Sequence, residues 1–296
     1  MSEVLRITLA KRKAEAFLRD EGIEELPVDP FAIAASRDIV VEPKPDAVEG
    51  VSGMLLRHGD SFGILYATHV PSEGFQRFSI AHELGHYFLD GHIDYVLAKG
   101  SQVHTSHAGF VSGDPYELEA DNFAAGLLMP DRPFKRGLEK CEPGISTVES
   151  MAKLCRTSLT ATAIRYAELT DDAVAVVVST GSTIDYCRMS EAMKSLRELS
   201  WLRKGSPVPM NTATARLNKN PDHVTRSDRA AEEIDIMDWL GGVRSVKALE
   251  EVVGLGSYGK TLTVIVCPSI HDDIKEEEEG DDEESVIDRW TPRFRR

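Results

Sequence analysis

The spacing of apolar residues predicts helices at the start of the chain. In residues 1–25 apolar positions recur every three or four residues, which is typical of an amphipathic helix. The segment 26–30 (LPVDP) breaks this pattern, and 31–36 (FAIAAS) predicts a second, short helix. The apolar face of the first helix consists of Ala10, Ala14, Phe17 and Leu18.

Two extended segments follow these helices. Residues 53–57 and 62–67 are rich in apolar and aromatic side chains, and 58–61 (HGDS) between them has the composition of a turn. The pattern therefore predicts a β-hairpin. We expect the segment 62–67 to be an edge strand, open to pairing with another extended chain.

Two longer helices are predicted in the middle of the chain. The first covers residues 75–89, and Gly91 is placed to end it with a left-handed residue. Residues 92–113 are expected to be loop. A second helix opens at Asp114-Pro115, because aspartate caps free amides and proline suits the first helical position, and it stops before Pro130.

The pattern changes near residue 170. Residues 146–168 predict a helical hairpin, whereas 173–178 (AVAVVV) and 261–267 (TLTVIVC) predict buried strands. A helix over 190–202 is expected between these strands. The residues after 271 are expected to be disordered, because a run of like charges repels and cannot be buried.

Composition narrows the classes of protein to consider. The net charge of −15 argues against binding to nucleic acid or anionic membranes through a broad basic surface. Ten acids and one lysine in Asp272–Glu284 account for more than half of it. The N-terminus lacks a secretory signal and no apolar run approaches a membrane span. The four cysteines are scattered without a CxxC pair, so we expect reduced thiols and a cytoplasmic protein.

The strongest chemical signal is His82-Glu83-Leu84-Gly85-His86, which lies within the predicted helix 75–89. Residues four apart on a helix point to the same side, so both imidazoles can reach one metal ion. Imidazole nitrogens are common zinc ligands, and the neighbouring Glu83 carboxylate can take a proton from a metal-bound water. The pattern predicts a zinc site with His82 and His86 as ligands and Glu83 as the general base.

The sequence leaves the third protein ligand open. Glu117 is favoured, because it shares a helical stripe with Asp121, which could orient a ligand histidine from behind. Glu119 is a rival carboxylate on another face of the same helix. A competing interpretation gives Glu117 only a capping role at the start of that helix.

His92 is another rival for the third ligand. It follows His86 by six residues, the spacing at which HExxHxxGxxH proteases place their third histidine. That pattern requires a glycine where this chain has Leu89. We expect leucine to let the helix continue to Gly91 and to carry His92 beyond the site.

Three segments together resemble the ImmA/IrrE family of metallopeptidases. They are LPVDPFAIA (26–34), RFSIAHELGHYFLD (77–90) and ELEADNFAAGLLMP (117–130). The resemblance implies an α+β, zincin-like metalloprotease domain followed by a helix-turn-helix-like segment. It also implies that His82 and His86 bind zinc, that Glu83 is the general base, and that Glu117 and Asp121 are the acidic ligand and its partner.

These patterns give a division into four parts. Residues 1–135 are expected to form the zincin-like domain, 136–170 the helix-turn-helix-like segment, 171–270 a C-terminal α/β extension of unknown role, and 271–296 an acidic tail. The resemblance implies a zinc-dependent endopeptidase whose substrate is a helix-turn-helix transcriptional repressor. No membrane partner and no direct binding to DNA are expected.

Peptide hydrolysis also requires a group that stabilises the developing oxyanion. Tyr87, Tyr95, His104 and His107 are candidates, and the sequence does not choose among them.

Two other functions are compatible with the same residues. One is a DNA-binding regulator that reads an operator with Ser146–Leu169. The net positive charge of this segment is smaller than a DNA-recognition module normally carries. The other is a catalytically silent, metal-bound protein that binds a partner or acts as a toxin.

Overall fold

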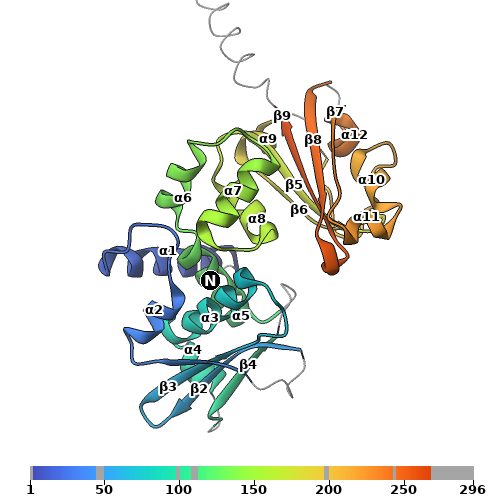
Figure 1. Ribbon diagram of the computed structural model, residues 1–296. Helices are drawn as coiled ribbons and strands as arrows, with labels where there is room; N and C mark the ends of the chain where they lie inside the picture. Colours follow the sequence, from blue (N-terminus) through green and yellow to red (C-terminus); the bar gives the residue numbers. More distant parts are fainter. Residues whose placement is uncertain are drawn as a thin grey trace, which may run out of the picture. The chain divides into compact units, whose positions relative to one another are not determined.

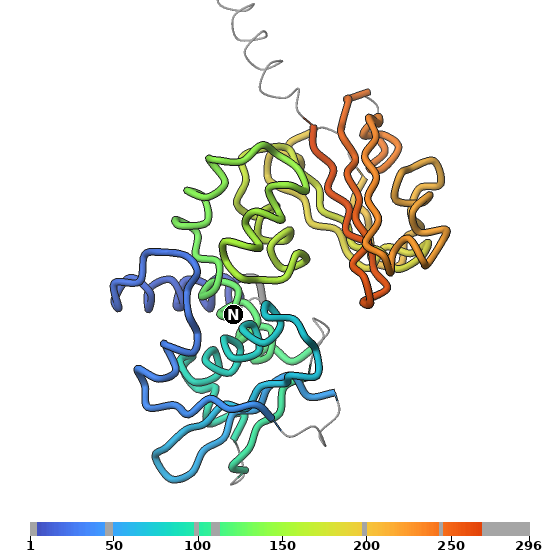
Figure 2. The backbone as a smooth tube through the Cα atoms, in the orientation of Figure 1, coloured from blue at the N-terminus to red at the C-terminus, as the bar shows by residue number. Residues whose placement is uncertain are grey.

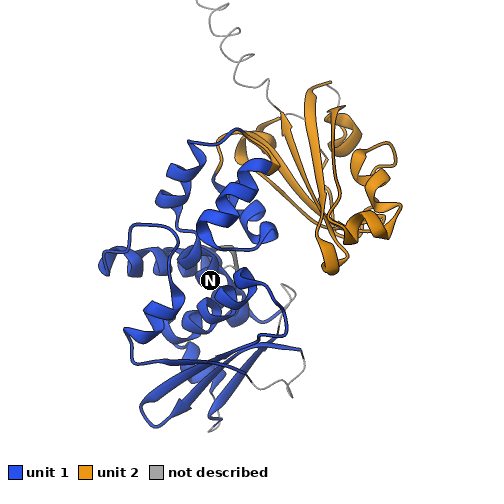
Figure 3. Cartoon of the chain, viewed as in Figure 1, with its two compact units in different colours: residues 1–142, 146–169 blue, residues 143–145, 170–296 orange. Residues whose placement is uncertain are grey.

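The computed structural model describes residues 3–44, 50–97, 101–107, 113–196, 200–242 and 245–267 (Figure 1). The chain divides into two compact units, one formed by residues 1–142 and 146–169 and the other by residues 143–145 and 170–296 (Figure 3). Both units combine helices with a sheet, which confirms the α+β class. Among the described residues no helix is both long and apolar enough to cross a bilayer. The acidic run expected to be disordered lies outside the described residues.

The first unit contains a four-stranded sheet in the order β1-β3-β2-β4 (Figure 1). The predicted hairpin is confirmed, because β2 and β3 pair antiparallel on either side of the tight turn at Gly59. Strand β1 pairs parallel with β3, and β4 pairs antiparallel with β2. The strands are β1 (Val40–Pro43), β2 (Val51–His58), β3 (Ser61–Tyr66) and β4 (Val103–His107).

The expectation of an edge strand at 62–67 is wrong. Strand β3 covers this segment and has a neighbour on each side, β1 and β2, so its backbone groups are already paired. Strand β4 is an edge instead, since β2 is its only partner among the described strands. The sequence did not reveal this order, because β4 lies in a segment that was expected to be loop.

The predicted N-terminal helices are confirmed. Helix α1 (Glu3–Asp20) buries Ala10, Ala14 and Leu18 on the expected face. Helix α2 (Pro30–Ala35) begins after Asp29, whose carboxylate accepts a hydrogen bond from the Phe31 amide. These helices share one apolar core with the sheet and with the two central helices.

The two central helices carry the residues of the predicted site. Helix α3 (Glu73–Phe88) begins at Ser72, whose hydroxyl accepts a hydrogen bond from the Phe75 amide. Helix α5 (Pro115–Leu128) begins at Asp114, whose carboxylate accepts from the Tyr116 amide, and it ends before Pro130 as expected. Serine and aspartate satisfy amides that the first helical turn leaves free, which explains where both helices start.

Helices α3 and α5 pack closely at Gly85. A Cβ at Gly85 would lie 3.1 Å from the Ala120 Cα and 3.2 Å from the Ala120 carbonyl oxygen. Because these are backbone atoms of α5, a side chain at position 85 would push the helices apart. The glycine within the HExxH motif therefore sets the distance between its histidines and the acidic residues of α5.

Gly85→Ala is expected to lower the stability of the protein. Helix propensity alone favours alanine over glycine by about 1 kcal/mol, so a gain would be expected if the helices did not touch here. Overpacking against a backbone typically costs about 1–3 kcal/mol. Thermal unfolding gives the sign of the change in stability. A lower midpoint in Gly85→Ala supports the close packing, and a higher midpoint contradicts it.

The expectations for residues 89–113 are wrong in two respects. Helix α3 ends at Phe88 rather than continuing to Gly91, because Leu89 adopts an extended conformation. Gly91 does have the left-handed conformation that was expected, with φ +78°, but it opens the short helix α4 (His92–Val96). Helix α4 and strand β4 replace much of the expected loop.

Three further helices complete the first unit: α6 (Asp131–Leu138), α7 (Ile145–Cys155) and α8 (Leu159–Leu169). The last two confirm the predicted helical hairpin. In α8 the buried Arg165 donates hydrogen bonds to the Met129 carbonyl and to the carboxylates of Glu15 and Asp131. These contacts tie α8 to other elements of the first unit.

The second unit contains a five-stranded antiparallel sheet in the order β6-β5-β9-β8-β7. The predicted strands are β9, at the centre of the sheet, and its neighbour β5; they are far apart in the sequence and run side by side (Figure 2). Every residue of β9 and seven of the eight in β5 are buried, as their continuous apolar runs indicate. The strands are β5 (Ala173–Thr180), β6 (Thr183–Met189), β7 (Arg229–Asp235), β8 (Lys247–Gly254) and β9 (Thr261–Cys267).

The helices of the second unit are short. The prediction of one helix over 190–202 is wrong in its length, because α9 ends at Ser195. The buried Glu250 of β8 accepts hydrogen bonds from the Ala213 and Thr214 amides at the start of α10. The helices are α9 (Glu191–Ser195), α10 (Ala213–Asn218), α11 (Pro221–Thr225) and α12 (Met237–Leu240), with a 3-10 turn at Gly256–Tyr258.

Candidate metal centre

Helix α3 directs the two predicted histidines to one point. The Nε2 atoms of His82 and His86 lie 3.1 Å apart, and both side chains are buried. A spacing of four residues places them one helical turn apart on the same face. The structure therefore brings the two imidazoles together as the sequence pattern predicts.

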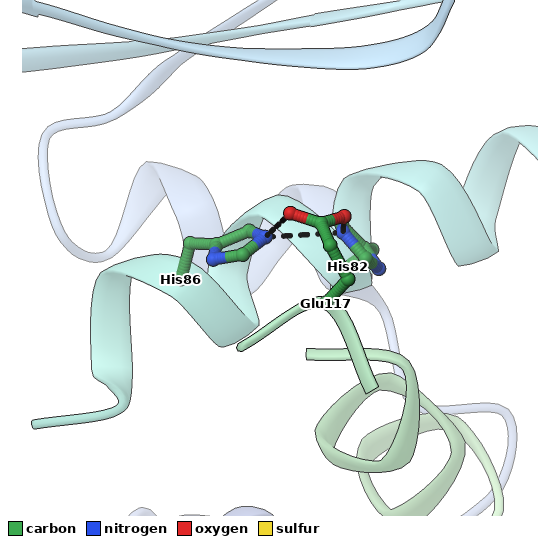
Figure 4. Close-up of side chains that lie close together, drawn as sticks. All are labelled: His82, His86 and Glu117. Atoms are coloured by element: carbon green, nitrogen blue, oxygen red, sulfur yellow. Dashed lines mark hydrogen bonds and ion pairs between the residues drawn. The ribbon is translucent and has the colours of Figure 1, made fainter. Parts of the chain in front are cut away.

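Helix α5 brings Glu117 to the same point. Its Oε2 lies 3.2 Å from His82 Nε2 and its Oε1 lies 3.4 Å from His86 Nε2. Figure 4 shows the carboxylate between the two imidazole rings. Asp114 caps the helix, and the Glu117 carboxylate points towards the histidines. These contacts do not fit the interpretation in which Glu117 only caps the start of its helix.

These three side chains fit a divalent metal ion. Their ligand atoms all lie within 4.8 Å of one another, and the separations of Nε2 and carboxylate atoms are 3.1, 3.2 and 3.4 Å. Donor atoms that are each about 2.1 Å from a tetrahedral ion are about 3.4 Å apart. Two imidazole nitrogens and a carboxylate oxygen are also a common donor set for a catalytic ion, which keeps one position for water.

Asp121 lies behind His82. Its Oδ1 is 2.8 Å from His82 Nδ1, on the opposite side of the ring from Glu117. A carboxylate in this place accepts a hydrogen bond from Nδ1–H and leaves the Nε2 lone pair free for a metal ion. Asp121 thus occupies the position that its spacing from Glu117 predicts.

Glu83 is fully buried beside this group. Neither of its carboxylate oxygens makes a hydrogen bond of ordinary geometry with the residues that the structure describes, and the Ser106 side chain lies near enough only to oppose the rise in its pKa. Burial raises the pKa of this carboxyl, because a low-polarity environment disfavours its charged form. A buried polar group without a partner is costly, so its retention points to a role that water or a substrate completes.

Gly53 of strand β2 makes room for Glu83. A Cβ at this position would lie 2.5 Å from Glu83 Oε1, closer than such atoms approach. Gly53 was not among the residues predicted from the sequence to form the site. A signal was present, since an isolated glycine inside a strand often marks a close approach of another group.

The structure separates the two rival ligands from the group of three. The ring of His92 approaches His86 from behind, with the two Nδ1 atoms 3.1 Å apart. Glu119 turns away as well, and its Oε2 lies 2.9 Å from His92 Nε2 while Arg6 pairs with its other oxygen. His92 returns to the site because α3 ends early and the chain turns at Gly91. The expectation that His92 would be carried beyond the site is therefore wrong.

Of the four oxyanion candidates, His104 lies nearest the candidate metal ligands. Its Nε2 is 3.1 Å from Glu117 Oε1, and its ring centroid is 4.7 Å from that of His86. Tyr87 packs against Phe62 and Phe88 instead. The other two candidates are exposed: Tyr95 stacks on Tyr116, and His107 lies at the end of β4.

Proton affinities differ sharply within the site. Burial lowers the pKa of His86 to about 4, whereas hydrogen bonds with Asp121 and Glu117 overcome burial and raise that of His82 to about 10. Burial would raise the pKa of Glu117, but hydrogen bonds from His104 and His82 hold it well below its usual range. Glu117 is therefore a carboxylate, and a metal cation would compete with a proton for His82.

Part of the chain matches a known family. Residues 34–165 match the family model described as the IrrE N-terminal-like domain, a group of peptidases. A search of curated proteins gave no match. Among solved structures, one described as a transcriptional regulator from Mycobacterium tuberculosis is similar, with a TM-score of 0.55 and 14% identity. That likeness covers 87% of this chain and 76% of the other, and at this identity it concerns the fold alone.

The matched segment contains every element of the candidate site, from Gly53 on β2 to Asp121 on α5. It leaves out α1 and almost all of the second unit. The zincin-like fold expected for this part of the chain is consistent with the match. Residues 34–165 therefore belong to the ImmA/IrrE family of metallopeptidases.

Proposed function

We propose that this protein is a zinc-dependent endopeptidase that cleaves a protein substrate of the helix-turn-helix repressor class. The observation that carries the proposal is the buried, unpartnered Glu83 carboxylate next to a set of two imidazoles and a carboxylate. A metal site with a purely structural role has no use for such a group. A hydrolytic site needs it to activate water.

His82, His86 and Glu117 would hold the zinc ion, with Asp121 orienting His82. When bound, zinc supplies a Lewis acid that polarises a carbonyl group and makes a water more acidic. Glu83 accepts a proton from the attacking water on a carboxylate oxygen and passes it to the leaving amine nitrogen. Its raised pKa suits it to hold that proton between the two steps.

The environment of the site supports an extended peptide as substrate. Strand β4 is an edge strand, and its His104 lies beside Glu117. A peptide that pairs with β4 would pass close to Glu83 and the ligands. His104 is then the candidate that donates a hydrogen bond to the developing oxyanion.

The direct test is cleavage of repressors by the zinc-loaded protein. A panel of helix-turn-helix repressors is incubated with wild type, Glu83→Gln and Glu73→Gln, and the products are identified by mass spectrometry. We expect wild type and Glu73→Gln to cleave one repressor at a defined bond. We expect Glu83→Gln to be slower by about 10²–10⁴-fold, the usual contribution of a general base.

Glu73 provides the matched control because it undergoes the same chemical change on the same helix but is half-exposed at its start. Equal cleavage by wild type and Glu83→Gln would contradict the role of Glu83. Intact repressors in every reaction, with zinc bound, would reject this substrate class.

Two observations weigh against the alternative of a DNA-reading helical hairpin. Arg165 of α8 is buried and paired with carboxylates, and Arg156 after α7 pairs with Glu73. Arg165 is therefore inaccessible to DNA, and the half-exposed Arg156 is engaged by a carboxylate, whereas DNA recognition requires cations that can contact phosphates.

A further inference from the structure

We propose that His92 is a positioning residue that fixes the tautomer of His86, through a hydrogen-bonded series running from Arg6 to the metal ligand. The series consists of Arg6, Glu119, His92 and His86. This inference rests on the proposed metal site, because it assigns the group that prepares one of its ligands.

The direction of each hydrogen bond follows from the carboxylate. Glu119 pairs with Arg6 and as a carboxylate it only accepts hydrogen bonds, so His92 donates its Nε2 proton across 2.9 Å. A neutral imidazole carries one proton, and His92 Nδ1 is then an acceptor. It lies 3.1 Å from His86 Nδ1, so His86 must carry its proton there. The remaining lone pair of His86 is on Nε2, the atom that faces His82 and Glu117.

Burial and aromatic packing hold His92 in this position. The side chain is fully buried, and its ring meets the edge of Tyr116 at 4.9 Å. Tyr116 is itself stacked on Tyr95 at 3.8 Å, and Arg6 lies 5.1 Å from its ring centroid. The imidazole cannot easily turn to another hydrogen-bond arrangement, because Glu119 and His86 occupy its two nitrogens.

The two histidine ligands are thus prepared by different means. A carboxylate, Asp121, contacts His82 Nδ1 directly. A neutral imidazole contacts His86 Nδ1, and the carboxylate is one residue further away. All three acids of the sequence Glu117-Leu118-Glu119-Ala120-Asp121 therefore serve the site, one at the metal position and two behind the ligands.

The test compares His92→Phe with His92→Asn. Phenylalanine keeps the aromatic ring but removes both nitrogens, whereas the asparagine Oδ1 can replace Nδ1 as acceptor for His86. In the metal-free protein labelled with ¹⁵N-histidine, long-range ¹H–¹⁵N NMR at one fixed pH reports which nitrogen of His86 carries the proton. We expect the Nδ1–H form in wild type and in His92→Asn, and a mixture of tautomers in His92→Phe.

Zinc affinity, measured by competition with a chelator, is the second measurement. We expect it to fall about 10–100-fold in His92→Phe, the usual effect of removing such a partner, and to recover most of this loss in His92→Asn. A structural role alone would favour phenylalanine over asparagine in this buried place. Two results would overturn the proposal. One is the same Nδ1–H fraction of His86 and the same zinc affinity in wild type and His92→Phe; the other is a zinc affinity in His92→Asn no higher than in His92→Phe.

Glu119→Ala gives an independent measurement if His92→Phe does not fold. It leaves His92 in place but removes the acceptor that fixes its proton, so we expect a smaller fraction of the Nδ1–H form of His86. An unchanged fraction of this form in Glu119→Ala would contradict the proposed series of hydrogen bonds. The NMR result needs neither zinc nor cleavage, so it separates failure of this inference from failure of the proposed enzyme.

Discussion

Glu117→Ala is expected to reduce zinc affinity by at least about 10²-fold. The variant removes one of three protein donors and the charge that faces two imidazoles at 3.2 and 3.4 Å. A zinc site with four protein ligands binds with about 10–16 kcal/mol, so one ligand contributes about 3 kcal/mol, or about 10²-fold. Chelator competition, with zinc counted per chain, measures the loss.

Glu119→Ala is the matched control for this prediction. It removes the same group from the same helix, but its carboxylate contacts His92 and Arg6 rather than the ligand atoms. We expect a loss of about 10-fold, typical of a residue that supports a ligand from behind. A larger loss in Glu119→Ala than in Glu117→Ala would reverse the assignment of the third ligand.

Gly53→Ala is expected to reduce peptidase activity by about 10²-fold while zinc binding is retained. The new Cβ would lie 2.5 Å from Glu83 Oε1, so the carboxylate must move. Displacement of a catalytic group by about 1 Å can cost about 10²-fold in rate. Stability should change little, because the clash is with the end of a flexible side chain.

Three measurements check this expectation: the rate of cleavage, the zinc content and the midpoint of thermal unfolding. Gly63→Ala on the neighbouring strand β3 is the control, since a Cβ there meets only ordinary contacts at 3.6 and 4.0 Å. We expect wild-type activity from this control. Full activity in Gly53→Ala would show that the position of the Glu83 carboxylate does not limit the reaction.

Much of the first unit could be predicted because its signals are local. Ala10, Ala14 and Leu18 repeat at helical spacing and are all buried in α1. Asp114-Pro115 marks the start of α5 through a capping contact within three residues. The orientation of His82 and His86 follows from the geometry of one helix, without reference to the rest of the chain.

The errors have a common physical origin. Strand β3 was expected at an edge because its own sequence does not show that β1 pairs with it from a distant segment. Helix α3 was expected to continue to Gly91, but Leu89 is extended and packs against the apolar core. Tertiary contacts thus overrode the local helical preference.

The sequence by itself determined the two imidazoles, the neighbouring Glu83 and the helix that carries them, because these relations lie within five consecutive residues. Only the tertiary structure shows that Glu117, and not Glu119, faces the two imidazoles, since the rotation of α5 depends on its packing against Gly85 of α3. It also decided that the His92 ring contacts His86 and that β4 is an edge strand among the described strands. These features join segments far apart in the chain, and long-range packing, not local spacing, sets their geometry.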